Sequence, residues 1–318
     1  MKSVASVETV AVAPDQLYQL DERTRTLLIE SAPLMSAWAK TDCRAKPDGG
    51  MEEWAKTQGR KDVLRLTSCD WYHGTWQYLR LLNMVAVPPW YRFYQKALSS
   101  FLRKRPESSI LIAAAADYGM LATLHEAVVT ARSTPRITVY DLCETPLRAC
   151  RWYAEREGLD IECVCDNIIT SATLPRGAFD LIVTDEFLTV VKAEDKPRVT
   201  RRWKDLLRPG GTVVTTAMIG EPTTPELRKS YAARARRLLE AQADVFRGMG
   251  VTSKELTDQI ERFAAFHTRH MISGEGEVRD LFADLYLAFC VPTDTPGECV
   301  NPTRSLQIIA SIPFGARA

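Results

Sequence analysis

Carboxylate and amide side chains directly follow three predicted strands of this 318-residue sequence. They are Asp141 after 137–140, Asp166 and Asn167 after 161–165, and Asp185 and Glu186 after 179–184. Parallel strands bring such side chains to one crevice, where open α/β sheets bind ligands. An acid that lies about 20 residues after the turn into the preceding helix can hydrogen-bond a ribose diol. Asp141 follows Gly119 by 22 residues, which predicts a nucleoside site, although any parallel strand–helix–strand unit gives a similar spacing.

A second group of candidate residues lies in the stretch 70–94, which is rich in aromatic side chains. The aromatic residues there are Trp71, Tyr72, Trp76, Tyr78, Trp90, Tyr91, Phe93 and Tyr94. Most of these rings are expected to pack a helical segment onto the main domain. The rings of Tyr72 and Trp76, with that of Tyr118, are also suited to lie against a cation. His73 is a candidate acid or base because its unperturbed pKa lies near neutral pH, and a hydrogen-bonded structural role is the alternative.

The elements that position these residues are predicted from apolar runs and amphipathic segments over 109–217. Strands are expected at 110–114, 137–140, 161–165, 179–184 and 212–216. Helices are expected at 120–131, 145–157 and 198–207, and a Pro-Gly-Gly turn at 208–211. Alternating strands and helices of these lengths predict an α/β fold with a doubly wound parallel sheet.

The flanking segments are predicted to cover the strand ends. Residues 1–106 are expected to form an N-terminal helical cap, with helices at 15–31 and 33–39 and a loop at 41–50; the main domain would be 107–318. A charged helical insertion at about 221–272 precedes a helix at 277–284, a strand at 285–291, a loop at 292–302 and a strand at 306–312. The late strands suit an antiparallel pair, and the cap and insertion suit a lid that excludes water.

Composition excludes several classes of partner. Lys and Arg total 41 against 40 Asp and Glu, so bulk charge indicates neither nucleic acid nor an anionic membrane. No run approaches the roughly 20 apolar residues of a membrane span. The eight cysteines include no C-x-x-C, which favours a cytoplasmic protein with reduced thiols and predicts no metal site. Cys163 and Cys165 would share one strand face, but two thiolates alone do not complete a tetrahedral zinc site.

The sequence resembles the class I S-adenosylmethionine-dependent methyltransferases over roughly 109–217. The resemblance is carried by ILIAAAADYGM in the place of the glycine-rich first motif, ITVYD, CDNI, FDLIVTDEF and LLRPGGTVV. The last two are the most specific, since their pairing has no role in a nicotinamide dehydrogenase. The resemblance implies a seven-stranded Rossmann-like sheet and S-adenosylmethionine as cofactor.

The resemblance also implies roles for individual residues. The first loop would contact the methionine part of the cofactor, the acid after the second strand its ribose, and the acid after the third strand its adenine. The implied cofactor-binding residues are Ala114, Ala116, Asp117, Tyr118, Gly119, Asp141, Leu142, Asp166, Asn167, Asp185 and Phe187. The candidates for acceptor binding or proton transfer are His73, Tyr72, Glu186 and Asp185.

The first loop departs from the family pattern. It reads Ala114-Ala115-Ala116-Asp117-Tyr118-Gly119 where the family has G-x-G-x-G. Alanine disfavours positive φ, so the cofactor would sit differently or Asp117 would hold its amino group.

The expected function is in-line methyl transfer from S-adenosylmethionine to a small-molecule acceptor, with positioning supplying about 7–11 kcal/mol. One alternative keeps the cofactor but performs aminocarboxypropyl transfer, or cyclisation to azetidine-2-carboxylate with release of methylthioadenosine. A second alternative is a nucleotide-binding protein without catalysis. The sequence names neither the acceptor nor the oligomeric state.

Overall fold

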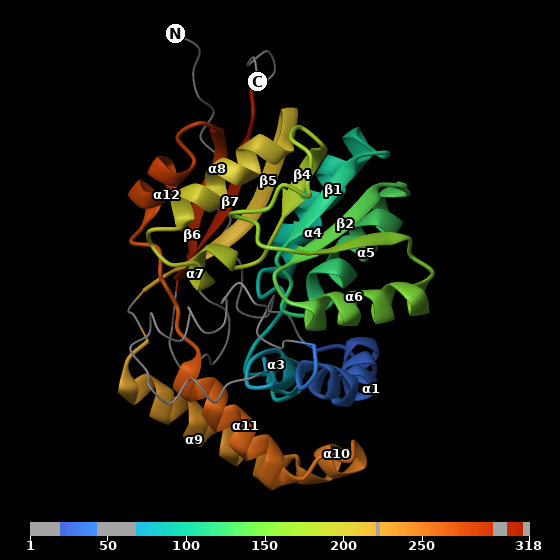
Figure 1. Ribbon diagram of the computed structural model, residues 1–318, viewed down its shortest axis with the longest axis vertical. Coiled ribbons are helices and arrows are strands. Elements are labelled where there is room, and N and C mark those ends of the chain that lie inside the picture. Colours follow the sequence, from blue (N-terminus) through green and yellow to red (C-terminus); the bar gives the residue numbers. More distant parts are fainter. Residues whose placement is uncertain (1–19, 43–67, 221–222, 295–303, 314–318) are drawn as a thin grey trace.

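The computed structural model describes residues 20–42, 68–220, 223–294 and 304–313. Within these ranges, seven strands form one sheet of order β3-β2-β1-β4-β5-β7-β6 (Figure 1). The strands are β1 (Ser109–Ala113), β2 (Arg136–Asp141), β3 (Ile161–Cys165), β4 (Phe179–Val183), β5 (Leu207–Ile219), β6 (Tyr286–Asp294) and β7 (Arg304–Ser311). Strands β1 to β5 pair in parallel, and β7 is antiparallel to both β5 and β6. The predicted α/β sheet and its late antiparallel pair are confirmed.

Helices cover both faces of the sheet because side chains alternate along its central strands. All five residues of β1 are buried. Ile110 and Ile112 belong to one core cluster with α4 (Tyr91–Lys104), α5 (Gly119–Ala131) and α6 (Glu144–Glu157). Leu111 and Ala113 belong to a second cluster, with α7 (Phe187–Val190), α8 (Lys196–Leu206) and α12 (Glu275–Leu281). The continuous apolar run of β1 is therefore a strand buried on both faces.

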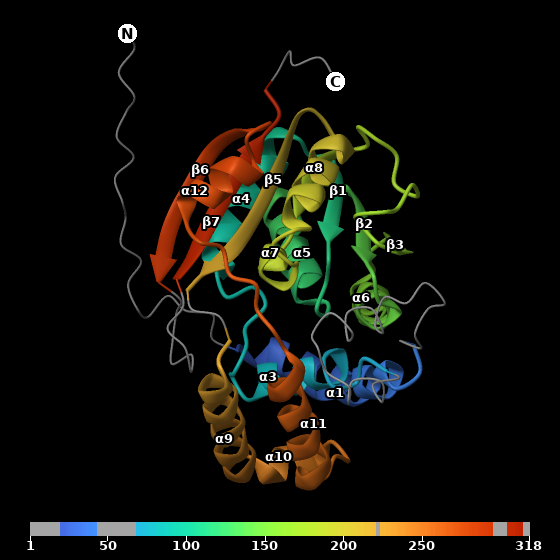
Figure 2. The same ribbon diagram turned by 60° about the vertical axis from the view of Figure 1, so that its left-hand side comes forward.

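A further helical layer lies beyond the carboxyl ends of the parallel strands (Figures 1 and 2). It consists of α1 (Glu22–Ala39), α3 (His73–Leu81), α9 (Pro225–Ala241), α10 (Ala243–Gly248) and α11 (Ser253–Phe266), which we call the distal helices. The two chain segments that form it are joined by Arg262 Nη2, which lies 2.9 Å from Asp70 Oδ2. Gln259 also donates to Ser36 Oγ at 3.3 Å. The N-terminal segment and the insertion thus form one layer facing the strand ends.

Helix α4 has a different place from the other helices of the N-terminal segment. It packs on α5 over one face of the sheet, although it belongs to the predicted cap at 1–106. The division of the chain at residue 106 stays a prediction. No helix in the described parts of the chain is long and apolar enough to span a membrane.

The predicted break before Pro33 was wrong, because α1 is continuous from Glu22 to Ala39. Leu28 and Met35, one on each side of the proline, are both fully buried, and this burial outweighs the missing amide hydrogen bond. Asp21 begins the helix by accepting a hydrogen bond from Thr24 N at 2.6 Å. The earlier start expected for this helix, at 15, and most of the loop at 41–50 lie outside the described residues.

The predicted turn at 208–211 was also wrong, since these residues lie inside β5. While β5 advances from Leu207 to Thr212, its partner β4 advances only from Phe179 to Leu181. The extra residues form an irregular segment of the strand. Gly211 is needed there, because a Cβ at this position would lie 2.8 Å from Arg208 O.

Candidate cofactor site and active site

The loop between β1 and α5 places an alanine in the left-handed conformation where the strand ends. Ala114 has a φ of 68°, and its amide donates to Tyr140 O at 2.8 Å. The next amide, Ala115 N, donates to Asp141 Oδ2 at 2.9 Å. A left-handed backbone is unfavourable for alanine, so β2 holds the loop in place through two hydrogen bonds. The chain therefore makes this turn without a glycine at the strand end.

Asp141 lies at the centre of the strand ends. Its Oδ1 accepts a hydrogen bond from Cys143 N at 2.7 Å, in addition to the bond from Ala115. A carboxylate has about four lone-pair positions, so two remain for a ligand. Burial raises the pKa of Asp141 to about 7, and the two amide donors act in the opposite direction. The next residue, Leu142, is 54% exposed and presents an apolar surface beside this carboxylate.

Asp117 is engaged within the protein. Its Oδ2 lies 2.5 Å from Arg80 Nη1, and both side chains are at most 2% exposed. Its Oδ1 accepts a hydrogen bond from Gly119 N at 2.8 Å. The proposed role of Asp117, to hold the amino group of a ligand, therefore competes with a buried ion pair that the sequence did not indicate.

Tyr118 and Gly119 pack the loop onto the helices. The Tyr118 ring stacks on that of Tyr153 in α6, with centroids 5.1 Å apart, and is 1% exposed. It lies in the core. A Cβ on Gly119 would lie 2.7 Å from Val87 Cγ1, so this position requires glycine. Ala116, between these residues and β1, is half-buried.

Asp166 and Asn167 form a polar turn after β3. Asp166 Oδ1 accepts from Asn167 N at 2.7 Å, and its Oδ2 accepts from Ser171 Oγ at 2.6 Å. Asn167 Oδ1 accepts from Ile169 N at 2.9 Å. Asp166 N donates to Asp141 O at 3.0 Å, so the ends of β2 and β3 are adjacent, as predicted.

The acids after β4 form a half-buried pair. Asp185 Oδ1 accepts hydrogen bonds from Thr216 Oγ1 at 2.9 Å and from Tyr94 Oη at 3.2 Å. Glu186 Oε1 accepts from Ser305 Oγ at 2.9 Å, and Oε2 has no hydrogen-bond partner among the described residues. Burial and the neighbouring Glu186 raise the pKa of Asp185 well above its usual range, while burial raises that of Glu186 to about 7.

The backbone at this pair is strained. Glu186 has a φ of 52°, a left-handed conformation that is rare for a residue other than glycine, and such strain concentrates at functional sites. Phe187, the first residue of α7, points to the core, where its ring lies 6.1 Å from that of Trp203.

Aromatic rings from the two segments of the distal helices meet in one cluster. The Tyr72 ring lies 5.3 Å from Trp76, 5.8 Å from Phe263 and 5.7 Å from His267, centroid to centroid. Burial, followed by nearby cationic side chains, lowers the pKa of His267 to about 3, which leaves this ring neutral. Burial raises the pKa of Tyr72, and so do the nearby carboxylates of Asp141 and Asp117. Tyr72 and Trp76 therefore lie together, and the insertion adds Phe263 and His267; their contact with a cation stays a prediction.

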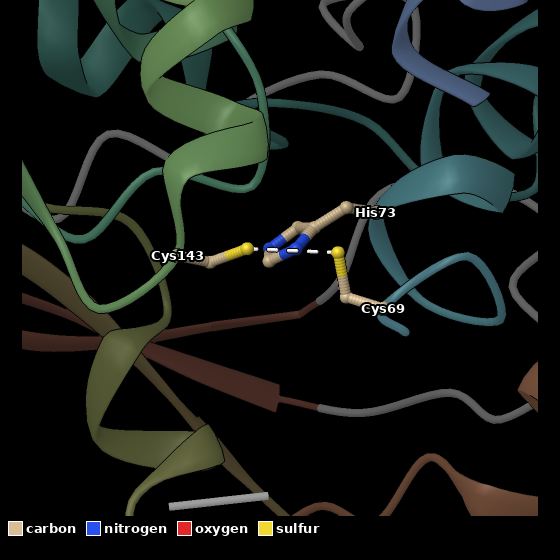
Figure 3. A group of neighbouring side chains, drawn as sticks. All are labelled: Cys69, His73 and Cys143. Atoms are coloured by element: carbon tan, nitrogen blue, oxygen red, sulfur yellow. Dashed lines mark hydrogen bonds between the residues drawn. The ribbon is translucent and has the colours of Figure 1, made fainter. Parts of the chain in front are cut away.

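His73 is placed among thiols instead of carboxylates. Cys69 Sγ lies 3.5 Å from Cys143 Sγ, and one ring nitrogen of His73 lies within 4.8 Å of both sulfur atoms (Figure 3). His73 is 9% exposed, and its Nδ1 has no hydrogen-bond partner among the described residues. The sequence analysis missed this group because Cys69 and Cys143 are 74 residues apart. The spacing of Cys69 and His73, four residues, was the only available signal.

A cavity of about 390 Å³ lies between α1 and α5. Its lining includes Asp21, Arg23, Arg92 and Glu126, with Gly119 at its edge. None of the acids that follow β2, β3 or β4 lines it.

A family model matches the central part of the chain. Residues 119–211 match the family model described as "Methyltransferase domain". No curated protein shows significant similarity to the chain.

Solved structures similar to the chain include several methyltransferases. One is the 1,6-didemethyltoxoflavin-N1-methyltransferase of Burkholderia thailandensis, at 15% identity and a TM-score of 0.48, covering 84% of this chain and 92% of that one. Another is a S-adenosylmethionine-dependent methyltransferase of Methanosarcina mazei, at 17% identity and a TM-score of 0.45, covering 66% and 94%. A geranyl diphosphate methyltransferase shows 14% identity and a TM-score of 0.43, covering 68% and 84%. Likenesses of this strength carry no information about the reaction.

The matched segment contains the residues that follow β2, β3 and β4, on a sheet of order β3-β2-β1-β4-β5-β7-β6. The chain therefore contains a methyltransferase domain match at residues 119–211, on a sheet with the Rossmann-like order that the resemblance to class I S-adenosylmethionine-dependent methyltransferases predicts. Its cofactor is S-adenosylmethionine, and the enzyme is a methyltransferase.

The residues at the strand ends fit this cofactor. Asp141 keeps two lone-pair positions for a ribose diol, and the exposed Leu142 offers an apolar face beside it. The turn at Ala114 brings the backbone of the loop next to Asp141, where Ala115 N donates to the carboxylate.

Proposed function

We propose that the protein transfers a methyl group to a small molecule bound between the strand ends and the distal helices. The observation that carries the proposal is the half-buried pair Asp185–Glu186 after β4, in which Ser305 holds Glu186 Oε1 and Oε2 has no hydrogen-bond partner among the described residues, and burial raises the pKa of Glu186 to about 7. A carboxyl with this pKa is suited to accept a proton from an acceptor at neutral pH. S-adenosylmethionine, when bound, supplies an activated methyl group, so positioning and proton removal are the tasks left to the protein.

The cofactor positions follow from the strand ends. In the proposal, Asp141 binds the ribose hydroxyls, Leu142 packs on the adenine, and Asp166 with Asn167 lies at the adenine edge. The loop 114–119 lies along the amino-acid part through its backbone, because the side chains of Asp117 and Tyr118 are committed to Arg80 and Tyr153.

Glu186 is the proposed proton acceptor, through Oε2. Ser305 holds the other oxygen of this carboxylate, and Asp185, bound by Tyr94 and Thr216, sets the charge beside it. His73 is less suited to this role, since its ring faces two thiols. Tyr72 is proposed as part of the acceptor wall, together with Trp76 and Phe263.

The arrangement of the distal helices favours a small molecule as the acceptor. Two chain segments close over the strand ends and are joined by the Asp70–Arg262 ion pair and the Ser36–Gln259 hydrogen bond. A cover joined in this way excludes water and limits the size of what binds beneath it.

The test uses the full chain, S-adenosylmethionine labelled in the methyl group, and a cell extract separated into low-molecular-mass and macromolecular fractions. We expect label in the low-molecular-mass fraction with an equal amount of S-adenosylhomocysteine. Glu186→Gln should lose this transfer, whereas the matched control Glu240→Gln, on the exposed face of α9, should keep it. Label in protein or nucleic acid would contradict the small acceptor. Methylthioadenosine as the product would indicate aminocarboxypropyl transfer or cyclisation instead.

A further inference from the structure

Cys69, His73 and Cys143 bring three metal-binding atoms together at the end of β2. Cys69 O accepts a hydrogen bond from His73 N at 2.9 Å, so one helical turn places both side chains on the same side. Cys143 comes from the other side of the interface, two residues after Asp141. The three ligand atoms lie within 4.8 Å of one another, and the two Sγ atoms are 3.5 Å apart (Figure 3).

These separations suit a tetrahedral zinc ion. Zn–S bonds of about 2.3 Å and Zn–N bonds of about 2.0–2.1 Å give ligand separations of roughly 3.5–3.8 Å around a tetrahedron. For two sulfur ligands the tetrahedral separation is about 3.8 Å, so the Sγ–Sγ distance of 3.5 Å is slightly shorter than this value and far longer than the roughly 2.05 Å of a disulfide. Thiolate and imidazole donors select zinc over magnesium or calcium.

The burial of His73 and the net charge of the three ligands also favour a zinc ion. His73 is 9% exposed and its Nδ1 lacks a hydrogen-bond partner among the described residues, which is unfavourable unless the nitrogen binds something else. Two thiolates and a neutral imidazole around a divalent ion make a group without net charge, as a buried site requires. Thr145 Oγ1 lies 3.3 Å from Cys69 Sγ and can donate to the thiolate, as outer partners of metal ligands do.

We propose that Cys69, His73 and Cys143 bind a zinc ion that joins the segment before α3 to the end of β2. Binding forms two Zn–S bonds and one Zn–N bond and releases one proton from each thiol, with no change of oxidation state. The three residues fill three of the four tetrahedral positions. Because Cys143 N donates to Asp141 Oδ1, the ion fixes the backbone that orients the ribose-binding acid.

The test measures metal content, and it needs no methyl transfer. The full chain, reduced and dialysed against zinc and then against buffer, should retain one zinc per chain. Cys69→Ser, His73→Asn and Cys143→Ser should each weaken zinc binding by more than about 100-fold, since loss of even an outer partner costs about 10- to 100-fold. The matched control Cys163→Ser, at a half-buried cysteine of β3, should bind as the parent does. Zinc bound equally by all variants, or not at all by the parent chain, would overturn the proposal.

Cobalt provides a readout on the parent chain, which avoids variants that fold poorly. A Co²⁺-loaded chain should show thiolate-to-cobalt charge-transfer absorption and the strong visible bands of a tetrahedral ion, and zinc should displace both. A spectrum typical of cobalt bound by oxygen atoms alone would overturn the proposal. Neither result depends on whether methyl transfer is found, so the two proposals fail separately.

Discussion

The acids after β2 and after β4 differ in their hydrogen-bond partners: Asp141 is buried, whereas Asp185 and Glu186 are half-buried. Asp141 is bound by two backbone amides, Ala115 N and Cys143 N, which favour its charged form. Asp185 and Glu186 are bound by hydroxyl groups of Tyr94, Thr216 and Ser305, and each acid lies beside the other. Backbone N–H groups can only donate, whereas hydroxyls can donate or accept. Burial raises the pKa of both Asp141 and Glu186 to about 7, so the two strand ends differ in their partners: groups that only donate hold Asp141, whereas groups that can also accept lie around Asp185 and Glu186.

Glu186→Gln is expected to have the largest effect. Loss of the proton acceptor should lower kcat by about 10²- to 10⁴-fold, the range for a general base. The affinity for S-adenosylmethionine should stay the same, because Glu186 has no part in the proposed cofactor contacts. Steady-state kinetics and calorimetry separate the two quantities. A variant with unchanged kcat would end the assignment of this residue as base.

Asp141→Asn tests the other half of the comparison. The amide keeps the size of the side chain but loses the charge that accepts from two ribose hydroxyls, at about 1.5–3 kcal/mol for a hydrogen bond to a charged group. The dissociation constant of S-adenosylmethionine should rise on the order of 100-fold by calorimetry. Asp244→Asn, at a fully solvated side chain, is the control. If Asp141→Asn and Asp244→Asn bind S-adenosylmethionine equally well, Asp141 does not bind the ribose.

The third largest effect is expected in the dependence of the free energy of unfolding on pH. Burial raises the pKa of Glu186 from 4.5 to about 7, so the folded state binds more protons than the unfolded chain between those values. The contribution of Glu186 to the free energy of unfolding should therefore fall as pH rises from about 4.5 to 7 and then level off, while Asp141 and Asp185 add contributions of the same sign. At 1.36 kcal/mol per unit of pKa, with a discount for partial exposure, the loss is about 2 kcal/mol. Urea unfolding at both ends of this range should show it, and Glu186→Gln should reduce it.

Tyr94→Phe should have the smallest effect. The Tyr94 hydroxyl donates to Thr184 O at 2.7 Å and lies 3.2 Å from Asp185 Oδ1, and its loss leaves Thr216 as a donor to that acid. We expect a loss of about 1 kcal/mol in the free energy of unfolding and a change of only a few fold in kcat. A loss of activity as large as that of Glu186→Gln would show that Tyr94 takes part in proton transfer itself.

The sequence predicts the parts of the fold that depend on local pattern. The runs that form β1, β2 and β4 are readable because burial on both faces gives continuous apolar segments. The edge strand β3, the helix that ends at Gly158 and the acids after the strands are readable from their own local residues. The continuous α1 was misread, since a proline is visible in the sequence and the burial that tolerates it is not.

The contacts of the site depend on residues far apart in the chain and were not predicted. The partner of Asp117 is Arg80, 37 positions earlier, and no local rule connects them. The same holds for Cys69 with Cys143 and for Glu186 with Ser305, 119 residues apart. Tyr118 was expected at a ligand because it adjoins the loop, but its ring fills the space over Tyr153. The residue types predicted the kinds of chemical group at the site. Which of these side chains contact one another depends on the packing of the folded chain.

The place of β7 has a consequence for how the enzyme forms during synthesis. β7 lies between β5 and β6, and its Ser305 is the hydroxyl that holds Glu186. A chain emerging from the ribosome can assemble β1 to β5 and the nucleoside end of the site while β6 still lacks its neighbour. The proton-accepting end is completed only when β7 enters the sheet. Cofactor binding and catalytic competence should therefore appear at different chain lengths, in that order.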